Sequence, residues 1–317
     1  MKKLTIALIS GGTSPERMIS IAGGDHVYQA LDKKLYRIIR YDLKTDVGRL
    51  VADANKIDAA FVVLHGICGE DGTVQGLLDL LGLPYQCTGV LGSALAMNKL
   101  ASKQIYEQKG LPVPPYKVLR WGDTINPRAL VECFGLPLVV KPVIGGSSIG
   151  MEIVRSEDAV KEALEQVFKH DKTVLVEKYI NGVEITAGVL GNNTLTVLPI
   201  IQIIPGDGCD FFNYEAKYKK DAAQEICPAK INDALTQKAQ KYGKIAHKAL
   251  FCKGYSRTDM IVDGKDIYVL ETNTIPGMTS GSLFPLAART AGISFDKLLD
   301  KLIALGITYH QNTKVDM

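Results

Sequence analysis

The sequence lacks several features that would assign it to a specialised class of protein. It has no CxxC pair among its six cysteines, no run of basic residues and no apolar segment long enough to span a bilayer. The scattered cysteines indicate buried, reduced thiols and a cytoplasmic protein. The net charge of +3 is small and its lysines lie among acids, so nothing indicates nucleic acid or a membrane as a partner.

The first residues are more typical of a strand than of a secretion signal. The basic start Met1–Lys3 and the apolar run Leu4–Ile9 resemble a signal peptide, but the run is too short and leads directly into two glycines. We therefore expect a first β-strand. With 317 residues, 46% of them hydrophobic, the chain can form two or three domains with substantial cores.

Two strand–loop–helix units follow, as in a doubly wound α/β domain. In the first, the strand leads through a glycine loop to a helix over 20–31, and Glu16 lies in that loop. The GxGxxG fingerprint is missing, so no dinucleotide site is predicted. Glu16 suits ligand binding and, equally, a first-turn acid that stabilises the helix dipole.

The second unit has a strand over 58–65, a glycine-rich loop and a helix over 73–81. It places His65, Glu70 and Asp71 at a carboxyl edge, where such sheets bind ligands. A histidine at a buried strand end is more often a satisfied structural group than a ligand. His65 by itself therefore does not identify a site.

A helix is predicted over 91–109 and includes Lys99, which taken alone is a solvated lysine. Gly110 and a cluster of prolines end it, and we interpret that cluster as a linker between domains.

Lys141 precedes a loop rich in glycine and serine, GGSSIG over 145–150, between two predicted strands. Successive backbone N–H groups of such a loop form a concavity suited to phosphate oxygens, and the lysine adds a positive charge. The loop is not a Walker motif, because GxxxxGK[ST] is missing and no helix follows. The alternative, a flexible hairpin, accounts less well for the lysine.

The strands over 173–176 and 183–190 meet at a turn that suits a hinge between domains. Its backbone groups could pair with an adenine edge, while Glu177 and Glu184 could accept hydrogen bonds from amino and ribose hydroxyl groups. Ordinary hairpin acids would give a similar pattern. Further on, the polar, aromatic-containing segment 205–228 has no clear periodicity and is typical of a packed lid.

A hairpin is predicted from two strands, 255–262 and 267–273, joined by Asp263-Gly264. Because side chains alternate along a strand, residues 271 and 273 share a face, and the paired strand can bring residue 259 beside them.

The three side chains concerned are Asp259, Glu271 and Asn273, which offer hard oxygen ligands of mixed charge. Such ligands suit Mg²⁺. Arg257 and the backbone N–H groups of the turn 276–279 add positive charge to this patch. The alternative is a solvated strand edge that carries ordinary acids. Helices are expected over 283–291 and 295–305, followed by a frayed tail from Thr308.

Together these pieces resemble the D-alanine–D-alanine ligases of the ATP-grasp superfamily over residues 3–306. Eight motifs in the family's order and spacing are far more specific than any single one. They are GGTSPER (11–17), HGICGEDGTVQG (65–76), SALAMNK (93–99), KPVIGGSSIGM (141–151), VEKYINGVE (176–184), NYEAKY (213–218), SRTDM (256–260) and ETNTIPGMTSGSL (271–283).

The resemblance implies an α/β protein, in part α+β, with the ATP-grasp fold. It implies an N-terminal doubly wound α/β domain over 1–95 and a central small α+β subdomain with the glycine–serine loop over 96–181. The C-terminal ATP-grasp domain over 182–317 would carry the lid loop and the Mg²⁺ site. Family members are expected to be homodimers.

The activity implied is ATP-dependent ligation of two D-alanines to D-alanyl-D-alanine through an acylphosphate, which yields ADP and phosphate and supplies peptidoglycan synthesis. One alternative is a ligase of the same fold that takes D-serine or another second substrate. Another is a nucleotide-binding protein without ligase activity.

The resemblance also implies roles for single residues. ATP would be held by Lys99, Lys141, Ser148, Glu177, Lys178, Ile180 and Glu184. Two Mg²⁺ ions, which Mn²⁺ could replace, would be bound by Asp259, Glu271 and Asn273. Catalytic roles would fall to Glu16, Ser147, Tyr218, Arg257 and Gly277. Substrate contacts would come from His65, Lys217, Ser282 and Leu283.

In the family, the Glu16 position orients the ammonium of the first D-alanine, and Arg257 and the Gly277 amide serve as oxyanion donors. Two residues depart from the family pattern. Gly145 replaces a larger residue of the phosphate loop, and Gly281 replaces a bulkier polar residue near the pocket for the second amino acid.

Overall fold

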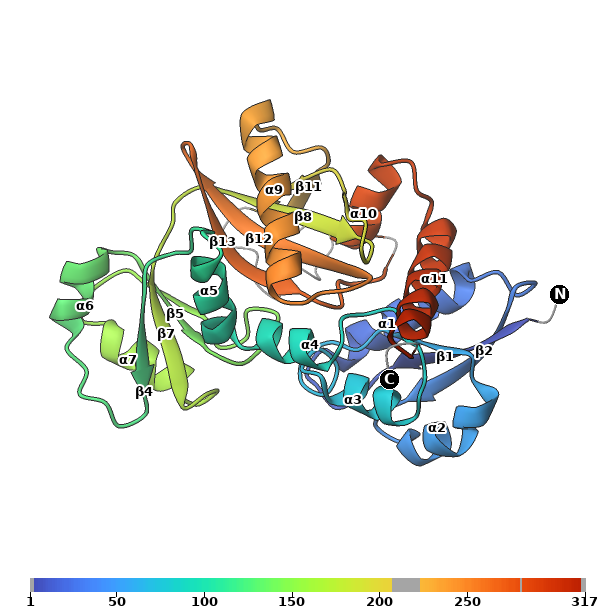
Figure 1. Cartoon of the computed structure of the whole chain (residues 1–317). Helices are drawn as coiled ribbons and strands as arrows, with labels where there is room; N and C mark the ends of the chain where they lie inside the picture. Colours follow the sequence, from blue (N-terminus) through green and yellow to red (C-terminus); the bar gives the residue numbers. More distant parts are fainter. Residues whose placement is uncertain (1–2, 207–222, 280, 315–317) are drawn as a thin grey trace.

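The computed structural model describes residues 3–206, 223–279 and 281–314. They form three sheets with helices packed against them (Figure 1). The first sheet is parallel, with strand order β2-β1-β3. Its strands and helices are β1 (Leu4–Ser10), α1 (Arg17–Ala30), β2 (Tyr36–Asp42), α2 (Val47–Asp53), a short 3-10 helix (Ala54–Lys56), β3 (Ala59–Val62) and α3 (Thr73–Leu80). The predicted strand–loop–helix order is confirmed.

The second sheet is antiparallel, with order β4-β7-β5-β6. Its elements are β4 (Tyr116–Arg120), α6 (Pro127–Phe134), β5 (Leu138–Pro142), β6 (Glu152–Val154), α7 (Val160–Val167) and β7 (Thr173–Lys178). Leu130, Leu164 and Val140 belong to a hydrophobic core that this sheet and its two helices form among themselves.

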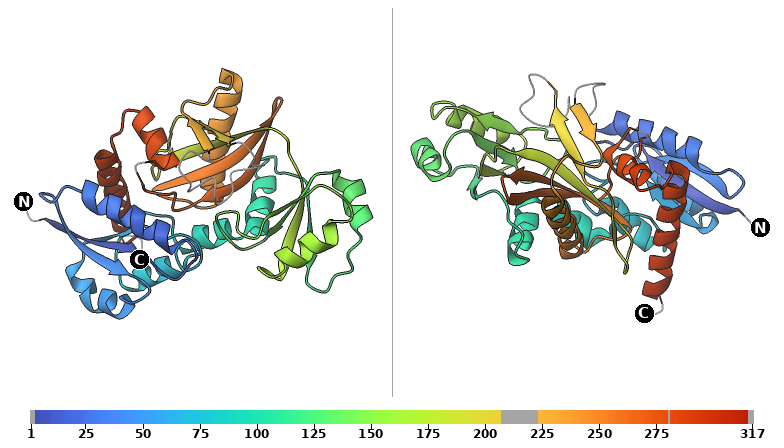
Figure 2. Two further views of the ribbon diagram at one scale, coloured as in Figure 1. Left: turned by 180° about the vertical axis from the view of Figure 1, so that it is seen from behind. Right: turned by 90° about the horizontal axis from the view of Figure 1, so that it is seen from above.

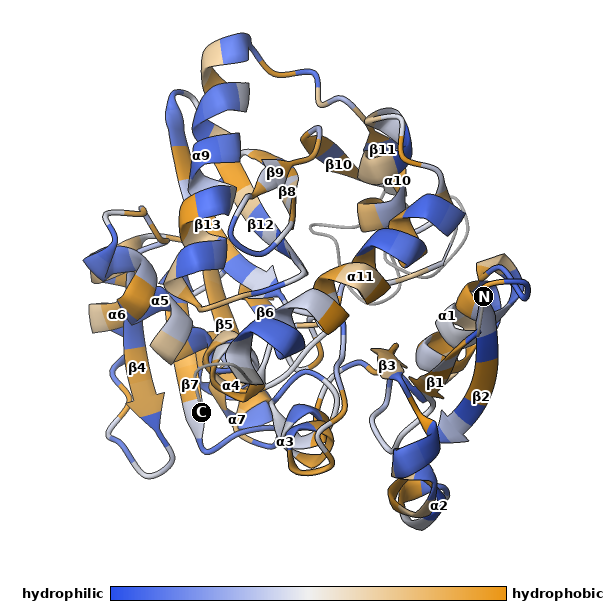
Figure 3. Cartoon of the chain, turned by 45° about the vertical axis from the view of Figure 1, so that its right-hand side comes forward, coloured by the Kyte–Doolittle hydropathy of each residue, from blue (hydrophilic) through white to orange (hydrophobic). Residues whose placement is uncertain are grey.

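The third sheet has the order β11-β10-β8-β12-β13, with β9 paired to β8. Its strands are β8 (Val183–Leu190), β9 (Thr196–Val197), β10 (Ile201–Pro205), β11 (Ala223–Ile226), β12 (Tyr255–Asp263) and β13 (Asp266–Asn273), and α9 (Asp233–Ala249) packs on it. Figure 3 shows hydrophilic colour over much of α9, which is amphipathic, and hydrophobic colour along β1 and β3.

Two sequence predictions about this sheet need correction. Strand β11 lies within the segment 205–228, which was predicted to lack regular structure, because its residues pair with β10. The β12–β13 turn is Gly264-Lys265 rather than Asp263-Gly264, and only Gly264 has a positive φ, +58°. A single positive φ at the first turn position suffices for a tight hairpin turn.

The single helix predicted over 91–109 is wrong, because the chain forms two helices, α4 (Val90–Met97) and α5 (Lys99–Gln108). Asn98 separates them with an extended backbone, and its side chain accepts a hydrogen bond from the Ala101 amide at 2.9 Å. The proline cluster that follows is tied to β13, since the Val269 amide donates to the Pro112 carbonyl at 2.8 Å.

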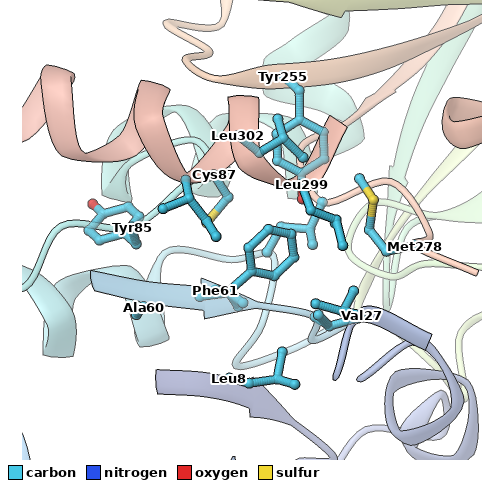
Figure 4. Close-up of a cluster of buried hydrophobic side chains, with 14 of the residues drawn as sticks. Leu8, Val27, Ala60, Phe61, Tyr85, Cys87, Tyr255, Met278, Leu299 and Leu302 are labelled. Atoms are coloured by element: carbon cyan, nitrogen blue, oxygen red, sulfur yellow. The ribbon is translucent and has the colours of Figure 1, made fainter. Parts of the chain in front are cut away.

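Helix α11 (Phe295–Lys314) returns to the first sheet (Figure 2), whereas Phe284 of α10 (Leu283–Thr290) packs its ring against Tyr255 of the third sheet, with ring centroids 5.4 Å apart. Leu299 and Leu302 of α11 join Phe61 of β3 and Val27 of α1 in one core (Figure 4). The tail predicted to fray from Thr308 is helical to residue 314. The ring of Tyr309 packs on the Lys253 ammonium at 3.9 Å, which anchors this end.

The cysteines were predicted to be buried, reduced thiols. The five cysteines within the described ranges form no disulfide, but Cys68 and Cys133 are exposed, so the expectation of burial is wrong for these two. They lie on a surface loop and on the outer side of a surface helix.

None of the helices in the described part of the chain combines the length and apolar character needed to cross a bilayer.

Candidate active site

Two cavities lie on either side of the glycine–serine loop, and Gly146 lines both. The first cavity lies among the second sheet, the third sheet and α5, and its polar lining consists of Lys99, Lys141, Ser148, Glu177, Lys178, Glu184, Asp259 and Glu271. Its apolar walls include Val139, Met151, Ile180, Ile261 and Leu270. An apolar cavity with a few converging charges is the usual form of a small-molecule site.

The break at Asn98 places Lys99 in the first cavity. Asn98 forms an isolated bridge with Ile144, and the Lys99 amide donates to the Val143 carbonyl at 2.9 Å. The Lys99 ammonium donates to the Gly145 carbonyl and lies 3.8 Å from Glu271 Oε2. A lysine that sequence reasoning alone treated as solvated therefore reaches both the loop and the hairpin.

Strand alternation places the other charged groups of this cavity. Val139 and Lys141 lie on one face of β5, and Glu177 of β7 is the cross-strand partner of Val139. The Lys141 ammonium lies 3.0 Å from Glu177 Oε2. The second glutamate of the hinge, Glu184, comes from β8, the next strand along the chain, which belongs to the third sheet.

The glycine–serine loop has an unusual backbone. Ser147 and Ser148 have φ values of +51° and +57°, in the left-handed region that side chains seldom adopt. Gly145 has a φ of +146°, which only glycine adopts readily. The glycine at position 145, where the family has a larger residue, therefore suits the backbone conformation of this loop. Ser147 Oγ donates to the Glu16 carboxylate, and this bond joins the glycine–serine loop to the loop between β1 and α1.

The hairpin brings its three oxygen-bearing side chains together as predicted. Asp259 and Glu271 are directly opposite each other, and Arg257 and Asn273 form a neighbouring cross-strand pair. Arg257 Nε and Nη2 donate to Asp259 Oδ1 and Oδ2 at 2.9 and 2.8 Å. The side-chain Nδ2 of Asn273 donates to Asp259 Oδ2 at 3.0 Å. A bulge follows Asp259, where the register shifts.

The second cavity draws its lining from five separate stretches of the chain, 16–19, 65–70, 146–147, 225 and 257–283. The predicted residues in it are Glu16, His65, Ser147, Arg257, Asn273, Gly277, Ser282 and Leu283. Gly281 also lines it, and a Cβ there would meet nothing within 4 Å, so this departure leaves the wall open. At Gly277, by contrast, a Cβ would come 2.9 Å from Ser282 Oγ, which explains the glycine.

Burial changes the protonation of two groups in this cavity. It lowers the pKa of His65, against the attraction of Glu16. Burial, together with the neighbouring Glu16, raises the pKa of Glu70 to about 8. Both shifts favour the uncharged form of the side chain. Glu70 Oε2 accepts a hydrogen bond from the Gly66 amide at 2.9 Å, which fixes the HGICGED loop.

Comparisons with known proteins agree with this arrangement. Family models described as D-ala D-ala ligase N-terminus and C-terminus match residues 45–88 and 105–304. The chain is 56% identical over 306 residues to a D-alanine–D-alanine ligase of Syntrophobacter fumaroxidans, covering 96% of this chain and 98% of that protein. The chain belongs to the D-alanine–D-alanine ligase family. A ligase of Desulfotalea psychrophila is 50% identical, with 99% and 98% covered.

A solved ligase structure shares the whole fold. The D-alanine–D-alanine ligase of Bacillus anthracis complexed with ATP superposes with a TM-score of 0.86 at 36% identity, covering 98% of this chain and 99% of that one. Such an extensive match identifies the ATP-grasp fold here, as expected from the motifs.

The two cavities separate the residues that the ligase family suggests for ATP from those it suggests for amino acids. All seven predicted ATP residues line the first cavity, and the predicted catalytic and substrate residues that the structure describes line the second. Tyr218 and Lys217 lie outside the described residues.

Sequence reasoning missed Glu225 of this ligase altogether and gave Glu70 no role, although both line the second cavity. Glu70 carried a signal, its place in a glycine loop at a strand's carboxyl edge. Glu225 carried none, because its strand was predicted as part of an irregular segment.

The hairpin side chains of this ligase suit a magnesium ion. Two carboxylates and one amide oxygen are hard donors, and they converge where the two cavities meet. Within the described ranges no cluster of three or more His, Cys, Asp or Glu side chains could hold a metal by itself. An ion held by these three donors would complete its coordination with phosphate oxygens and water.

Proposed function

We propose that this chain joins two D-alanines through an acylphosphate, with ATP in the first cavity and the amino acids in the second. One observation carries the proposal. Asp259 and Glu271 line the first cavity, whereas Arg257 and Asn273, the neighbouring cross-strand pair, line the second. The site for transferring phosphate and the site for receiving it would therefore be adjacent on one hairpin.

The first step would transfer the γ-phosphoryl group to the carboxylate of the first D-alanine. An oxygen of that carboxylate bonds to phosphorus as the bond to ADP breaks. Such transfers are catalysed mainly by positioning and charge neutralisation. Lys99 and Lys141 supply positive charge in the first cavity, and the left-handed serines of the loop present backbone N–H groups beside them.

Magnesium bound by Asp259, Glu271 and Asn273 would neutralise phosphate charge. The chain's own contribution on the acceptor side is Glu16, which suits the ammonium of the first D-alanine and is held by Ser147. With Glu16 so fixed, the first amino acid would lie with its carboxylate towards Arg257.

The second step would be attack of the second D-alanine's neutral amine on the acylphosphate carbonyl. A C–N bond forms as the C–O bond to phosphate breaks, the bonding electrons leave with phosphate, and the proton lost from nitrogen goes to the departing phosphate or to water. The tetrahedral oxygen carries negative charge and needs fixed donors. The Arg257 guanidinium, held by two bonds to Asp259, and the Gly277 amide line this cavity and suit that role.

A substrate panel tests the proposed function. ADP release is measured with D-alanine, D-serine, D-lactate and L-alanine, and the product with D-alanine is identified as the dipeptide by mass spectrometry. We expect D-alanine to give the highest kcat/KM. Faster turnover with D-serine as the second substrate would favour the same-fold alternative, and no turnover with any amino acid would leave only nucleotide binding.

We also propose the sequence-based domain ranges 1–95, 96–181 and 182–317, a homodimer and a cytoplasmic location. The core shared by the first sheet and α11 supports close association of the first and last ranges. Light scattering on the purified protein measures the assembly directly, and a monomer would refute the dimer.

A further inference from the structure

Lys103 of α5 is a fully buried lysine that none of the predictions above uses. It lines neither cavity. Lysines are almost never fully buried unless an opposite charge pairs with them. The side chain therefore has a specific partner or a large energetic cost.

The partner of Lys103 is Glu177, the buried glutamate at the end of β7. Lys103 Nζ lies 3.1 Å from Glu177 Oε1, and Lys141 Nζ lies 3.0 Å from Glu177 Oε2. Each carboxylate oxygen thus faces one lysine, Lys103 from the protein interior and Lys141 from the cavity wall. The ring of Tyr116, 5.4 Å from Lys103 Nζ, lies beside the same ammonium.

The cluster carries two ammonium groups and one carboxylate, hence a net charge of +1. Burial by itself would raise the pKa of Glu177, but Lys103 and Lys141 together lower it, so the carboxylate is ionised. Burial lowers the pKa of Lys103 to about 8, against the attraction of Glu177. At neutral pH Lys103 still carries its charge in most molecules.

We propose that Lys103 is a positioning residue for ATP, which neutralises Glu177 from the interior so that Lys141 can bind a phosphate. This inference rests on the proposed function, in which Lys141 binds a phosphate group of ATP. Without Lys103, Lys141 would be the one cation left beside this buried carboxylate among the residues that the structure describes. A buried charge that loses its partner is strongly unfavourable, so phosphate would have to compete with Glu177 for Lys141.

The test replaces Lys103 by methionine, whose unbranched side chain is only one heavy atom shorter than that of lysine and carries no charge. Lys109→Met, on an exposed residue at the end of the same helix, is the matched control. We expect the Kd for ADP by calorimetry and the KM for ATP to rise roughly tenfold or more in K103M. The kcat at saturating ATP should stay within about threefold of wild type, and K109M should match wild type.

A double variant separates the charge role from simple packing. In E177Q the carboxylate is gone, so adding K103M should change the Kd for ADP by less than about twofold. Loss of a purely structural lysine would weaken binding equally in both backgrounds, and this result, or unchanged ADP binding in K103M, would overturn the proposal. If K103M does not fold, comparing E177Q with the double variant still decides, since neither keeps an unpaired carboxylate.

The ADP measurements are independent of ligation. A wild-type protein that binds ADP but does not turn over D-alanine would refute the proposed function and leave the role of Lys103 to be judged from the binding constants.

Discussion

Asp259 receives hydrogen bonds from side chains on three neighbouring strands. Thr186 of β8, Arg257 of β12 and Asn273 of β13 all donate to it. Each of these bonds to an ionised group is stronger than a neutral one, and together they fix the carboxylate's orientation. Glu271 opposite it is less constrained, with Lys99 at 3.8 Å. Of these two carboxylates, Glu271 is therefore the one whose substitution should disturb the fold less.

Replacing Glu271 by glutamine removes a charged metal donor while keeping its shape. We expect ADP release with D-alanine to fall on the order of a hundredfold or more, because phosphate charge is then poorly neutralised. The thermal unfolding midpoint should change little. Glu152→Gln, on an exposed residue of β6, is the control. A rate near that of wild type would show that Glu271 holds no essential ion.

His247 is a residue whose titration affects the stability of the fold rather than the site. Its Nδ1 lies 2.7 Å from Ser256 Oγ in the interior, and burial lowers its pKa to about 4. The ordinary value is about 6.5, so between these two pH values the unfolded chain binds more protons than the folded one. Folding stability is therefore lost as the pH falls through this window.

Replacing His247 by glutamine should remove this pH dependence. The free energy of unfolding, from urea titrations at about pH 7 and about pH 4.5, is expected to fall less in H247Q than in wild type. His170→Gln, on an exposed residue, should behave as wild type. An equal fall in all three proteins would mean that other groups cause the acid sensitivity.

At the scale of elements, the break between α4 and α5 has the largest consequence. One residue with an extended backbone redirects the chain, and the next residue, Lys99, begins a new helix beside the loop. Asparagine is a preferred N-cap because its side chain accepts a bond from the first turn. The same device begins α9, where Asn232 accepts from the Leu235 amide at 2.9 Å.

These two caps make a matched pair of substitutions. Asn98→Ala and Asn232→Ala should each cost about 1 kcal/mol of stability, measured by urea unfolding. Only N98A should also raise the KM for ATP, because only that cap positions a lysine of the first cavity. The idea fails if the KM changes equally in both variants, or in neither.

At the scale of the whole molecule, one core joins the two ends of the chain. Residues of β1, β3, α10 and α11 belong to it, and the Tyr36 hydroxyl donates to Asp300 at 2.9 Å beside it. The second cavity takes Glu16 from the first sheet and Arg257 from the third. The packing of α11 therefore helps to hold the two sides of that cavity together.

Shortening a leucine in this core tests its contribution. Leu302→Ala should lower the free energy of unfolding by about 2–5 kcal/mol, because the side chain is fully buried and leaves a cavity. Leu80→Ala, with that side chain 88% exposed, should change it by less than about 0.5 kcal/mol. Similar losses in both variants would contradict the packing described.

The sequence by itself determined the local elements and the family. Period-two and helical patterns predicted most strands and helices, the glycine–serine loop and hairpin acids indicated phosphate and magnesium, and eight ordered motifs identified the ligases. These features depend on backbone preferences and side-chain alternation within a few residues, which the sequence states directly.

Only the tertiary structure decided which distant residues meet. It joined Glu16 to Ser147, 131 residues apart, and it buried Lys103 against Glu177. It also returned α11 to the first sheet. Such contacts depend on how whole elements pack, and no local pattern encodes them, because a charged residue such as Lys103 can be buried only where packing brings a partner of opposite charge beside it.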